Sequence, residues 1–442
     1  MADFTSMQYK VFLTPRTADL TYGAEIQISA EIIFNGIKTM KKSIDSSDYE
    51  VGVYTYGDIT LKVVNKNGKY NDEIDNRSVF KFSRDLARVR VVYSDNDGDI
   101  TRFNGLINDE ATKQDFDKEE VQFRVLSNDS VIRTTKVAGG LIANGVLASS
   151  AIKSILNQAK ITSVLNFSDS NINVDQDFTV DIGSEFDNRN GRKALNDLLV
   201  ASNSVLIIDI NDNMIVQSRN ESSGDILTLF GPYDEKMRQN IHSVKKYNPG
   251  KHRTFTSVKI GGIEVSDNGF VTQFGFRQFE SNLDFITNDG TRTTVGNRIL
   301  EEFKTPMIEL EVSIPTRVAK NAQLLDRVSV NFPLRIRRIK DKFLPTVGIT
   351  KIDDSEMPLP DVFGNASISP VTAFKIIAIA ENPTTFETIL KLRQYGWFSD
   401  PSSSIVGFAI IGQSKIAGTG DLCDKWSPAT ISGAQVGCTK IA

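Results

Sequence analysis

The feature that most constrains the fold is a series of short alternating segments between residues 49 and 93. Apolar or β-branched residues at every second position mark each segment, and turn-forming residues separate the segments. Gly57 and Asp58 are predicted to break the run, and residues 65–68 to turn the chain. The alternating positions are Tyr49, Val51, Val53 and Thr55, then Ile59, Leu61 and Val63, and finally Val89, Val91 and Tyr93. This period of two predicts strands with one buried face in a sandwich or barrel, and points to architecture before catalysis.

The chain has 442 residues, enough for two to four domains of ordinary size. Its 55 acidic and 51 basic residues give a formal net charge of −4, so attraction to nucleic acid or to an anionic membrane is not expected. The N-terminus shows no secretory signal, and no stretch has the roughly 20 apolar residues that cross a bilayer. We therefore expect synthesis in a cytoplasm and no membrane partner. The final location lies elsewhere if the protein leaves within an assembly.

The pattern of strands and helices predicts a mainly β protein with an α+β insertion. Residues 1–127 are β-rich, and their last strand has Val121, Phe123 and Val125 on one side. Residues 128–245 mix helices with a hairpin, which predicts a small α+β module. Residues 246–398 return to β structure with an inserted helix. Residues 399–442 are rich in Ser, Gly, Ala and Ile, and predict a C-terminal extension that orders against something else.

Apolar residues at three- and four-residue spacing predict three helices. They cover about 148–160, 191–203 and 293–304, and Thr293 or Thr294 is the expected cap of the third. A hairpin is predicted over residues 205–218. Beyond it, the apolar residues at 270–271 and 274–276 are interpreted as strands.

The sequence lacks the motifs of common enzymes. Lys251 is followed by His252 instead of Ser or Thr, and lacks the upstream glycine of a phosphate-binding loop. No Gly-x-Ser-x-Gly elbow occurs. The histidines, His242 and His252, have no nucleophile motif beside them, so we expect both on the surface. We predict no catalytic residue, no cofactor and no metal site, since the mere presence of 55 carboxylates decides nothing.

Residues 95–99, with the sequence Asp-Asn-Asp-Gly-Asp, resemble the start of a calcium-binding loop. An EF-hand loop needs a carboxylate at its twelfth position, where this chain has Leu106. We interpret the segment as a hairpin turn and keep adventitious calcium binding as the alternative.

A run of basic residues stands out in this acidic protein. Its members are Arg335, Arg337, Arg338, Lys340 and Lys342. One interpretation is a solvated hairpin whose apolar residues pack inward. The other is a docking patch for an acidic partner subunit.

Both cysteines, Cys423 and Cys438, lie in the last twenty residues. They are either two free thiols or a disulfide that pins the C-terminal extension under oxidising conditions. Without a nearby histidine they do not make a zinc site.

Three stretches, taken in order, match one pattern. The first runs from 44–51 through 68–70 to 78–80, and the second joins a helix at 194–199 to a hairpin strand at 215–216. The third comprises 324–330, 374–377 and 388–393, and includes a Leu-Leu-Asp-Arg-Val turn. This order, over residues 25 to 395, resembles the hub proteins of long-tailed bacteriophages. That family has Leu-Gly-Asp-x-Val at the turn, so Leu325 stands at its glycine position.

The resemblance implies a structural role. Each chain would supply two tail-tube-like β-barrel domains, 1–127 and 246–398, and three chains would form a ring of six barrels in the tail tip or baseplate of the virion. The module at 128–245 would face away from the tube. The implied partners are further copies of the chain, a distal tail protein ring, a central fibre or tip protein, and the tape measure protein. DNA would pass through the channel without specific binding during genome ejection after host attachment.

An acidic balance suits a conduit for DNA because it avoids binding phosphate. Residues 95–120 hold nine carboxylates against Arg102, Lys113 and Lys118, and our hypothesis is that some of them line the channel. Two other function classes stay open. One is a virion-associated cell-wall hydrolase, and the other is a host-binding adhesin that acts through residues 399–442.

Overall fold

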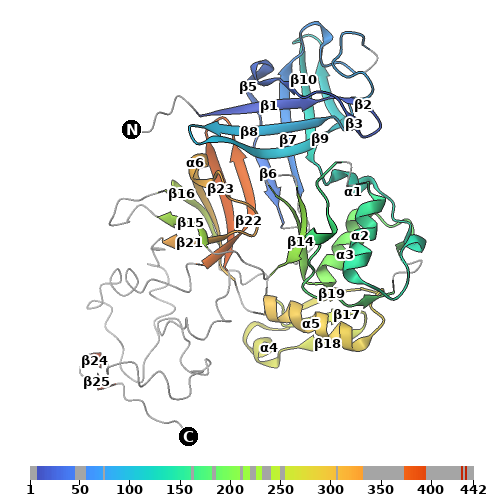
Figure 1. Cartoon of the computed structure of the whole chain (residues 1–442). Coiled ribbons are helices and arrows are strands. Elements are labelled where there is room, and N and C mark those ends of the chain that lie inside the picture. The colour runs from blue at the N-terminus through green and yellow to red at the C-terminus, as the bar shows by residue number, and fades with distance from the viewer. Residues whose placement is uncertain are drawn as a thin grey trace.

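The chain folds into an N-terminal β unit, a C-terminal β unit and a middle module, each with its own hydrophobic core. In Figure 1 the N-terminal β unit lies at the top, the C-terminal β unit below it on the left, and the middle module on the right and at the bottom. The computed structural model describes residues 7–44, 56–72, 75–160, 164–181, 186–209, 213–219, 225–230, 240–248, 254–304, 307–331, 373–394, 430–431 and 434–435.

The N-terminal β unit closes around residues that alternate along its strands. Ile59, Leu61 and Val63 of β7 are buried, as are Val121 and Phe123 of β10, so the predicted period of two is confirmed here. The strands are β1 (Gln8–Thr14), β2 (Arg16–Ala18), β3 (Thr21–Tyr22), β4 (Ile26–Gln27), β5 (Ile32–Ile37), β6 (Met40–Ser43), β7 (Tyr56–Val64), β8 (Arg88–Asp95), β9 (Gly98–Asp115) and β10 (Glu120–Ser127).

The predicted break at Gly57 and Asp58 is wrong, because β7 runs through both residues. Strand β6 pairs with this part of β7 and passes very close to it. A Cβ atom on Gly57 would lie 2.6 Å from the carbonyl oxygen of Lys41. The glycine therefore permits a close strand approach and does not end the strand.

The C-terminal β unit is continuous with the N-terminal one, because β22 pairs with β6 and the two units share a 14-stranded sheet. Its core includes Val312, Val328, Ile376 and Leu390. Its elements are β15 (Asp225–Phe230), β16 (Ser243–Asn248), β20 (Glu309–Pro315), α6 (Thr316–Ala319), β21 (Arg327–Asn331), β22 (Ala373–Asn382) and β23 (Glu387–Gln394). Apart from these, β24 (Thr430–Ile431) and β25 (Ala434–Gln435) form a small antiparallel pair.

The two β units have the same connectivity. Numbered along the chain, β1, β6, β7, β8, β9 and β10 lie in the spatial order 2-3-6-5-4-1. The strands β15, β16, β20, β21, β22 and β23 lie in the same order, 2-3-6-5-4-1. Neighbouring strands are antiparallel in both units, except that β15 runs parallel to β21 whereas β1 runs antiparallel to β8.

The middle module packs helices against short sheets. The predicted apolar face of the first long helix is confirmed, since Ala148, Ile152 and Ile155 are all buried. The elements are α1 (Ser130–Thr134), β11 (Val146–Leu147), α2 (Ala148–Gln158), β12 (Thr179–Val180), α3 (Gly191–Ala201), β13 (Ser204–Ile208), β14 (Met214–Ser218), β17 (Ser257–Ile260), β18 (Ile263–Ser266), α4 (Asn268–Phe274), β19 (Gln278–Ser281) and α5 (Asp289–Phe303).

Strand β13 belongs to two cores at once. Leu206 packs in the middle module, whereas Val205 and Ile207, on the opposite face of the strand, pack in the C-terminal β unit. The predicted hairpin of β13 and β14 is confirmed. The hairpin therefore separates the core of the middle module from that of the C-terminal β unit.

Two local predictions in the middle module are wrong. The segment interpreted as strands at 270–271 and 274–276 contains helix α4, because the Asp267 side chain caps the backbone N–H groups of Gly269 and Phe270. Phe270 and Phe274 then stack on one helix face, with ring centroids 5.9 Å apart.

The cap of α5 is Asn288 instead of Thr293 or Thr294, so the helix starts at Asp289, before the predicted residue 293. The Asn288 side chain accepts a hydrogen bond from the Thr291 N–H, and both predicted threonines donate to carbonyls one turn back. None of the helices in the described ranges is both long and apolar enough to cross a membrane.

Candidate assembly site between the two β units

Main-chain hydrogen bonds run from one β unit into the other through β6. This strand pairs with β7 on one edge and with β22 on the other, with Lys41 opposite Ala380 and Ser43 opposite Ala378. The Ile44 N–H adds a hydrogen bond of 3.0 Å to a carbonyl of the C-terminal β unit. The two units therefore meet as one sheet, which fixes their relative orientation.

Buried charges lie beside this seam. The Arg102 guanidinium of β9 donates to the Glu381 carboxylate of β22 at 2.8 Å, and their side chains are only 4% and 3% exposed. The same guanidinium donates to the Lys320 carbonyl at 2.5 Å. A buried ion pair is stable only when its remaining hydrogen-bonding groups are also satisfied, and here both charges have further partners.

Tyr9 of β1 completes the cluster. Its hydroxyl donates to the second oxygen of Glu381 at 2.5 Å, and its ring lies 5.5 Å from that of Tyr93 and 5.4 Å from that of Phe386. Burial, and then the charge of Glu381, raise the pKa of Tyr9. The phenol therefore stays protonated and acts as a donor.

A second ionic contact joins the units at the tip of the β8–β9 hairpin. Lys320, just after α6, lies 3.0 Å from the Asp95 carboxylate and 2.5 Å from that of Asp97. The other Asp95 oxygen accepts from the Asp97 N–H, and Gly98 adopts a φ of 125°. The predicted hairpin turn is confirmed. Of the three carboxylates that suggested calcium, Asp95 and Asp97 bind the Lys320 ammonium and Asp99 binds that of Lys10. Within the described residues, no cluster of His, Cys, Asp and Glu has the make-up of a metal site.

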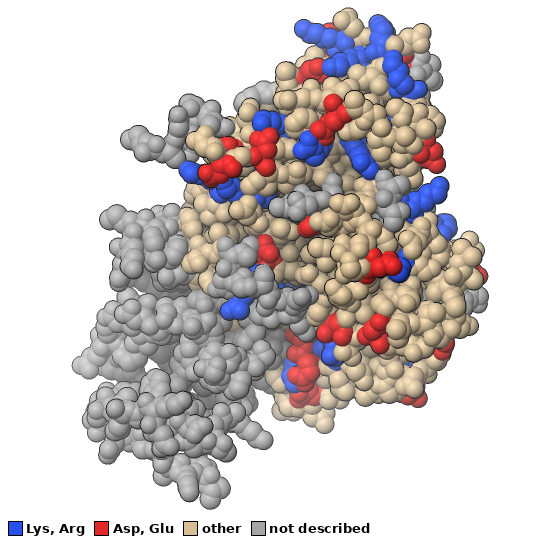
Figure 2. All heavy atoms as spheres, in the orientation of Figure 1, with Lys and Arg blue, Asp and Glu red and all other residues tan. Residues whose placement is uncertain are grey.

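The structure also places the acidic stretch 95–120. Six of its nine carboxylates form ion pairs within the chain; they are Asp95, Asp97, Asp99, Asp109, Asp115 and Glu120. Glu110, Asp117 and Glu119 are exposed near the β9–β10 turn. Figure 2 shows acidic and basic side chains mixed over the visible face of the N-terminal β unit. That some of these carboxylates line a channel remains a prediction.

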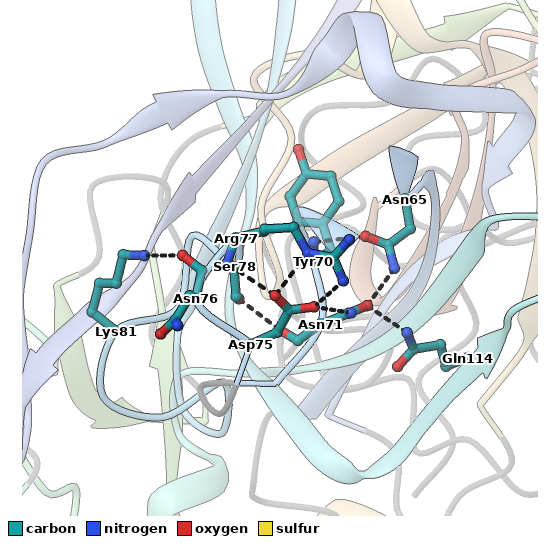
Figure 3. A network of polar contacts seen from close by, with 9 residues as sticks. All are labelled: Asn65, Tyr70, Asn71, Asp75, Asn76, Arg77, Ser78, Lys81 and Gln114. Carbon is teal, nitrogen blue, oxygen red and sulfur yellow. Dashed lines mark hydrogen bonds and ion pairs between the residues drawn. The ribbon is translucent and has the colours of Figure 1, made fainter. Parts of the chain in front are cut away.

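A polar network stiffens the loop between β7 and β8 (Figure 3). The Asp75 carboxylate accepts two hydrogen bonds from the Arg77 side chain, at 2.9 and 3.0 Å, and one from Asn71. Asn71 in turn accepts from Asn65 at 2.7 Å and from Gln114 of β9 at 2.5 Å. These hydrogen bonds lower the pKa of Asp75, with Arg77 as the largest cause. The loop is thereby attached to the outer part of β9.

Of the residues singled out in the sequence, Asp95 and Asp97 lie at this site. The basic run Arg335, Arg337, Arg338 and Lys340, both cysteines and His252 fall outside the described residues, so their interpretations stay predictions. His242 is exposed, as expected.

The sequence reasoning missed Tyr9, Lys320 and Glu381. Each has its partner more than two hundred positions away. A local pattern therefore carried no signal for them.

Comparison with solved structures shows which fold this is. The tail protein from Neisseria meningitidis MC58 superimposes with a TM-score of 0.53 over 88% of this chain and 96% of its own, at 11% identity. The fold is that of a phage tail protein. The 43 kDa tail protein of prophage MuSo2 from Shewanella oneidensis gives a TM-score of 0.51 over 87% of this chain and 98% of its own, at 10% identity.

No protein-family model matches the chain, and the curated proteins contain no match. The expectation of a mainly β, tail-protein fold with an α+β insertion is confirmed. The likeness establishes the tail-protein fold.

Proposed function

We propose that this protein is a structural, non-enzymatic hub of a phage tail tip or baseplate, and that three copies form a ring with pseudo-sixfold symmetry. The observation that carries the proposal is the shared strand order 2-3-6-5-4-1 of the two β units. Two similar units per chain let three chains present six similar units around an axis.

The end strands of each sheet lie close to one another, which supports a barrel for each β unit. In the N-terminal unit, β4 and β5 stand at opposite ends of the set β5-β7-β10-β9-β8-β1-β4, yet only the short turn Ser29–Glu31 separates them in the chain. In the C-terminal unit, β15 and β16 stand at opposite ends, and Asn240 beside β16 donates to the Thr228 carbonyl of β15 at 2.9 Å.

The division of the chain into 1–127, 128–245, 246–398 and 399–442 remains a proposal. Strands β15 and β16 pair with β21 and β20 of the C-terminal unit. Residues 254–303 pack in the core of the middle module.

In this proposal the ring lies in the virion, between a distal tail protein ring and a central fibre or tip protein. Its channel holds the tape measure protein and later passes DNA. The buried seam sets the angle between the two units before assembly, so each chain brings two of the six units to the ring in a fixed orientation.

The test is the mass and shape of the purified full-length protein. Sedimentation is expected to give three times the mass of the chain, and electron-microscope class averages along the symmetry axis are expected to show six similar lobes around an opening. A monomer at all accessible concentrations, or a particle without an opening, would contradict the proposal.

A further inference from the structure

The seam inside one chain shows how one β unit receives another. Strand β22 pairs along its first half, at Ala373 to Lys375, with β21 of its own unit. Its second half, Ala378 to Glu381, pairs on that same edge with β6 of the other unit. The end of a long hairpin strand thus accepts a strand from the neighbouring unit.

Strand β9 occupies the same position, number five, in the N-terminal β unit. Its first half, Gly98 to Leu106, pairs with β8 of its own unit. In its outer half, Lys113 to Asp115 pair among the described strands only with β10, and an irregularity separates them from Asn108. The β7–β8 loop contacts this part of β9 through the side chains of Asn71 and Asp85. No described strand fills the edge that corresponds to the one filled by β6, so a further strand can pair there.

The two hairpins also match in detail. Four residues connect β9 to β10, and four connect β22 to β23. The last residue of each turn has a left-handed backbone, with φ of 49° at Glu119 and 51° at Phe386. Each hairpin carries an irregularity, between Asn108 and Lys113 of β9 and at Ile377 in the middle of β22.

The burial of the two hairpin ends differs. In the β22–β23 hairpin, Glu381 and Pro383 are buried, and Phe386 packs against Tyr9 of the other unit. In the β9–β10 hairpin, no residue from Asn108 to Asp115 is buried. Phe116, the first residue of the turn, is 75% exposed, more than any other large apolar side chain in the described chain.

We propose that a second copy of this chain covers the outer end of β9, using its own C-terminal β unit. This inference rests on the proposed ring and names the surfaces that close it. The occupants are the strands at positions one and two of that unit, β15 and β16, because β1 and β6 are the strands that contact β22 within the chain. Strand β16 stands at the end of the large sheet, with β20 as its partner among the described strands.

Such a contact is heterologous, because the outer end of β9 on one copy meets a different surface on the next. A heterologous contact closes into a ring only at a fixed rotation. The seam within the chain supplies that rotation, since the same positions in the two units meet there. In a ring of three copies, the seam within each chain would alternate with a contact of the same kind between neighbouring chains.

A photo-crosslinker tests the geometry directly. Phe116 of the full-length protein is replaced by a benzophenone-bearing phenylalanine analogue, and light and heavy isotope-labelled chains are mixed. Irradiation is expected to join position 116 to peptides of β15 or β16 from a differently labelled chain. Crosslinks confined to one chain, or to the middle module of a second chain, overturn the inference.

A substitution gives the energetic test. Phe116→Ser is expected to weaken trimerisation by about tenfold or more, because one phenyl ring loses its buried contact. The control is Phe276→Ser, which removes a 61% exposed phenylalanine after α4 and is expected to change the dissociation constant less than about twofold.

If the wild-type protein is a trimer and Phe116→Ser does not weaken it, this inference is overturned and the proposed ring stands. A wild-type monomer would overturn the ring itself.

Discussion

Arg102 and Glu381 lie 279 positions apart in the chain and form a salt bridge that is almost completely removed from solvent. Breaking one side of such a pair leaves an uncompensated buried charge. We therefore expect Glu381→Gln to lower the free energy of unfolding by about 3–5 kcal/mol, measured by urea denaturation. The double variant Arg102→Met with Glu381→Gln should lose less than the sum of the two single variants.

The exposed pair Arg90 and Glu25 supplies the control for that experiment. Its side chains are 36% and 38% exposed, so Glu25→Gln should change the free energy of unfolding by less than about 1 kcal/mol. Equal effects at Glu25 and Glu381 would show that burial at the seam does not matter.

Leu325 stands where the hub resemblance has glycine, and its φ of 69° lies in the left-handed region. A left-handed conformation costs a residue with a side chain about 1–2 kcal/mol. Leu325→Ala and Leu325→Gly remove similar packing, but only glycine also removes the strain. We expect the glycine variant to be the more stable of the two by about 1 kcal/mol in urea denaturation.

The neighbouring position reverses the order. Leu324 is also buried, and its φ is not positive. There the alanine variant should be more stable than the glycine variant, because glycine loses more chain entropy on folding. The same order at both positions would refute the strain at Leu325.

Burial raises the pKa of Asp326 to about 6, against a smaller lowering effect of the hydrogen bond from the Gln323 N–H. The folded state therefore holds the proton more tightly than the unfolded chain does, whose carboxyl has the ordinary value of 3.8. This group adds stability as the pH falls from about 6 towards 4, and the gain is lost as the pH rises again. Asp326→Asn should remove that part of the pH dependence in urea denaturation between pH 7 and pH 4.5.

Asp99 has the opposite shift. Hydrogen bonds from Ser94 and Lys10 lower its pKa, so its stabilising effect is lost only as the pH falls below the ordinary range of the carboxyl. Asp99→Asn should leave the slope between pH 7 and pH 4.5 unchanged. An Asp326→Asn variant with the wild-type slope would contradict the burial argument.

Gly105 of β9 lies very close to strand β10. A Cβ atom there would lie 2.4 Å from the Leu126 carbonyl oxygen. We expect Gly105→Ala to cost about 1–3 kcal/mol of unfolding free energy in urea denaturation, since the strands have to move apart. Gly140→Ala is the matched control, because nothing lies within 4 Å of its Cβ position, and a change above about 0.5 kcal/mol there would be unexpected.

The sequence was most informative where the pattern is local. The alternation at Ile59, Leu61 and Val63 and the apolar face of α2 each follow from positions a few residues apart, and both are confirmed. Helix α4 shows how short apolar runs mislead, because Phe270 and Phe274 fit a strand as well as a helix until the Asp267 cap is considered.

The candidate site was beyond local reasoning for a physical reason. Glu381 lies near the end of a mostly apolar strand, and the side chains that bind it come from β1 and β9. The left-handed turn at Leu325 was reachable, but through family resemblance and not through composition. Long-range pairing decides where buried charges go, and no window of the sequence contains both partners.

Strand β13 has a mechanical consequence. Because one of its faces belongs to the middle module and the other to the C-terminal β unit, a force applied to the module reaches the neighbouring sheet through tightly packed side chains. The module can therefore act as a stiff lever arm on its β unit.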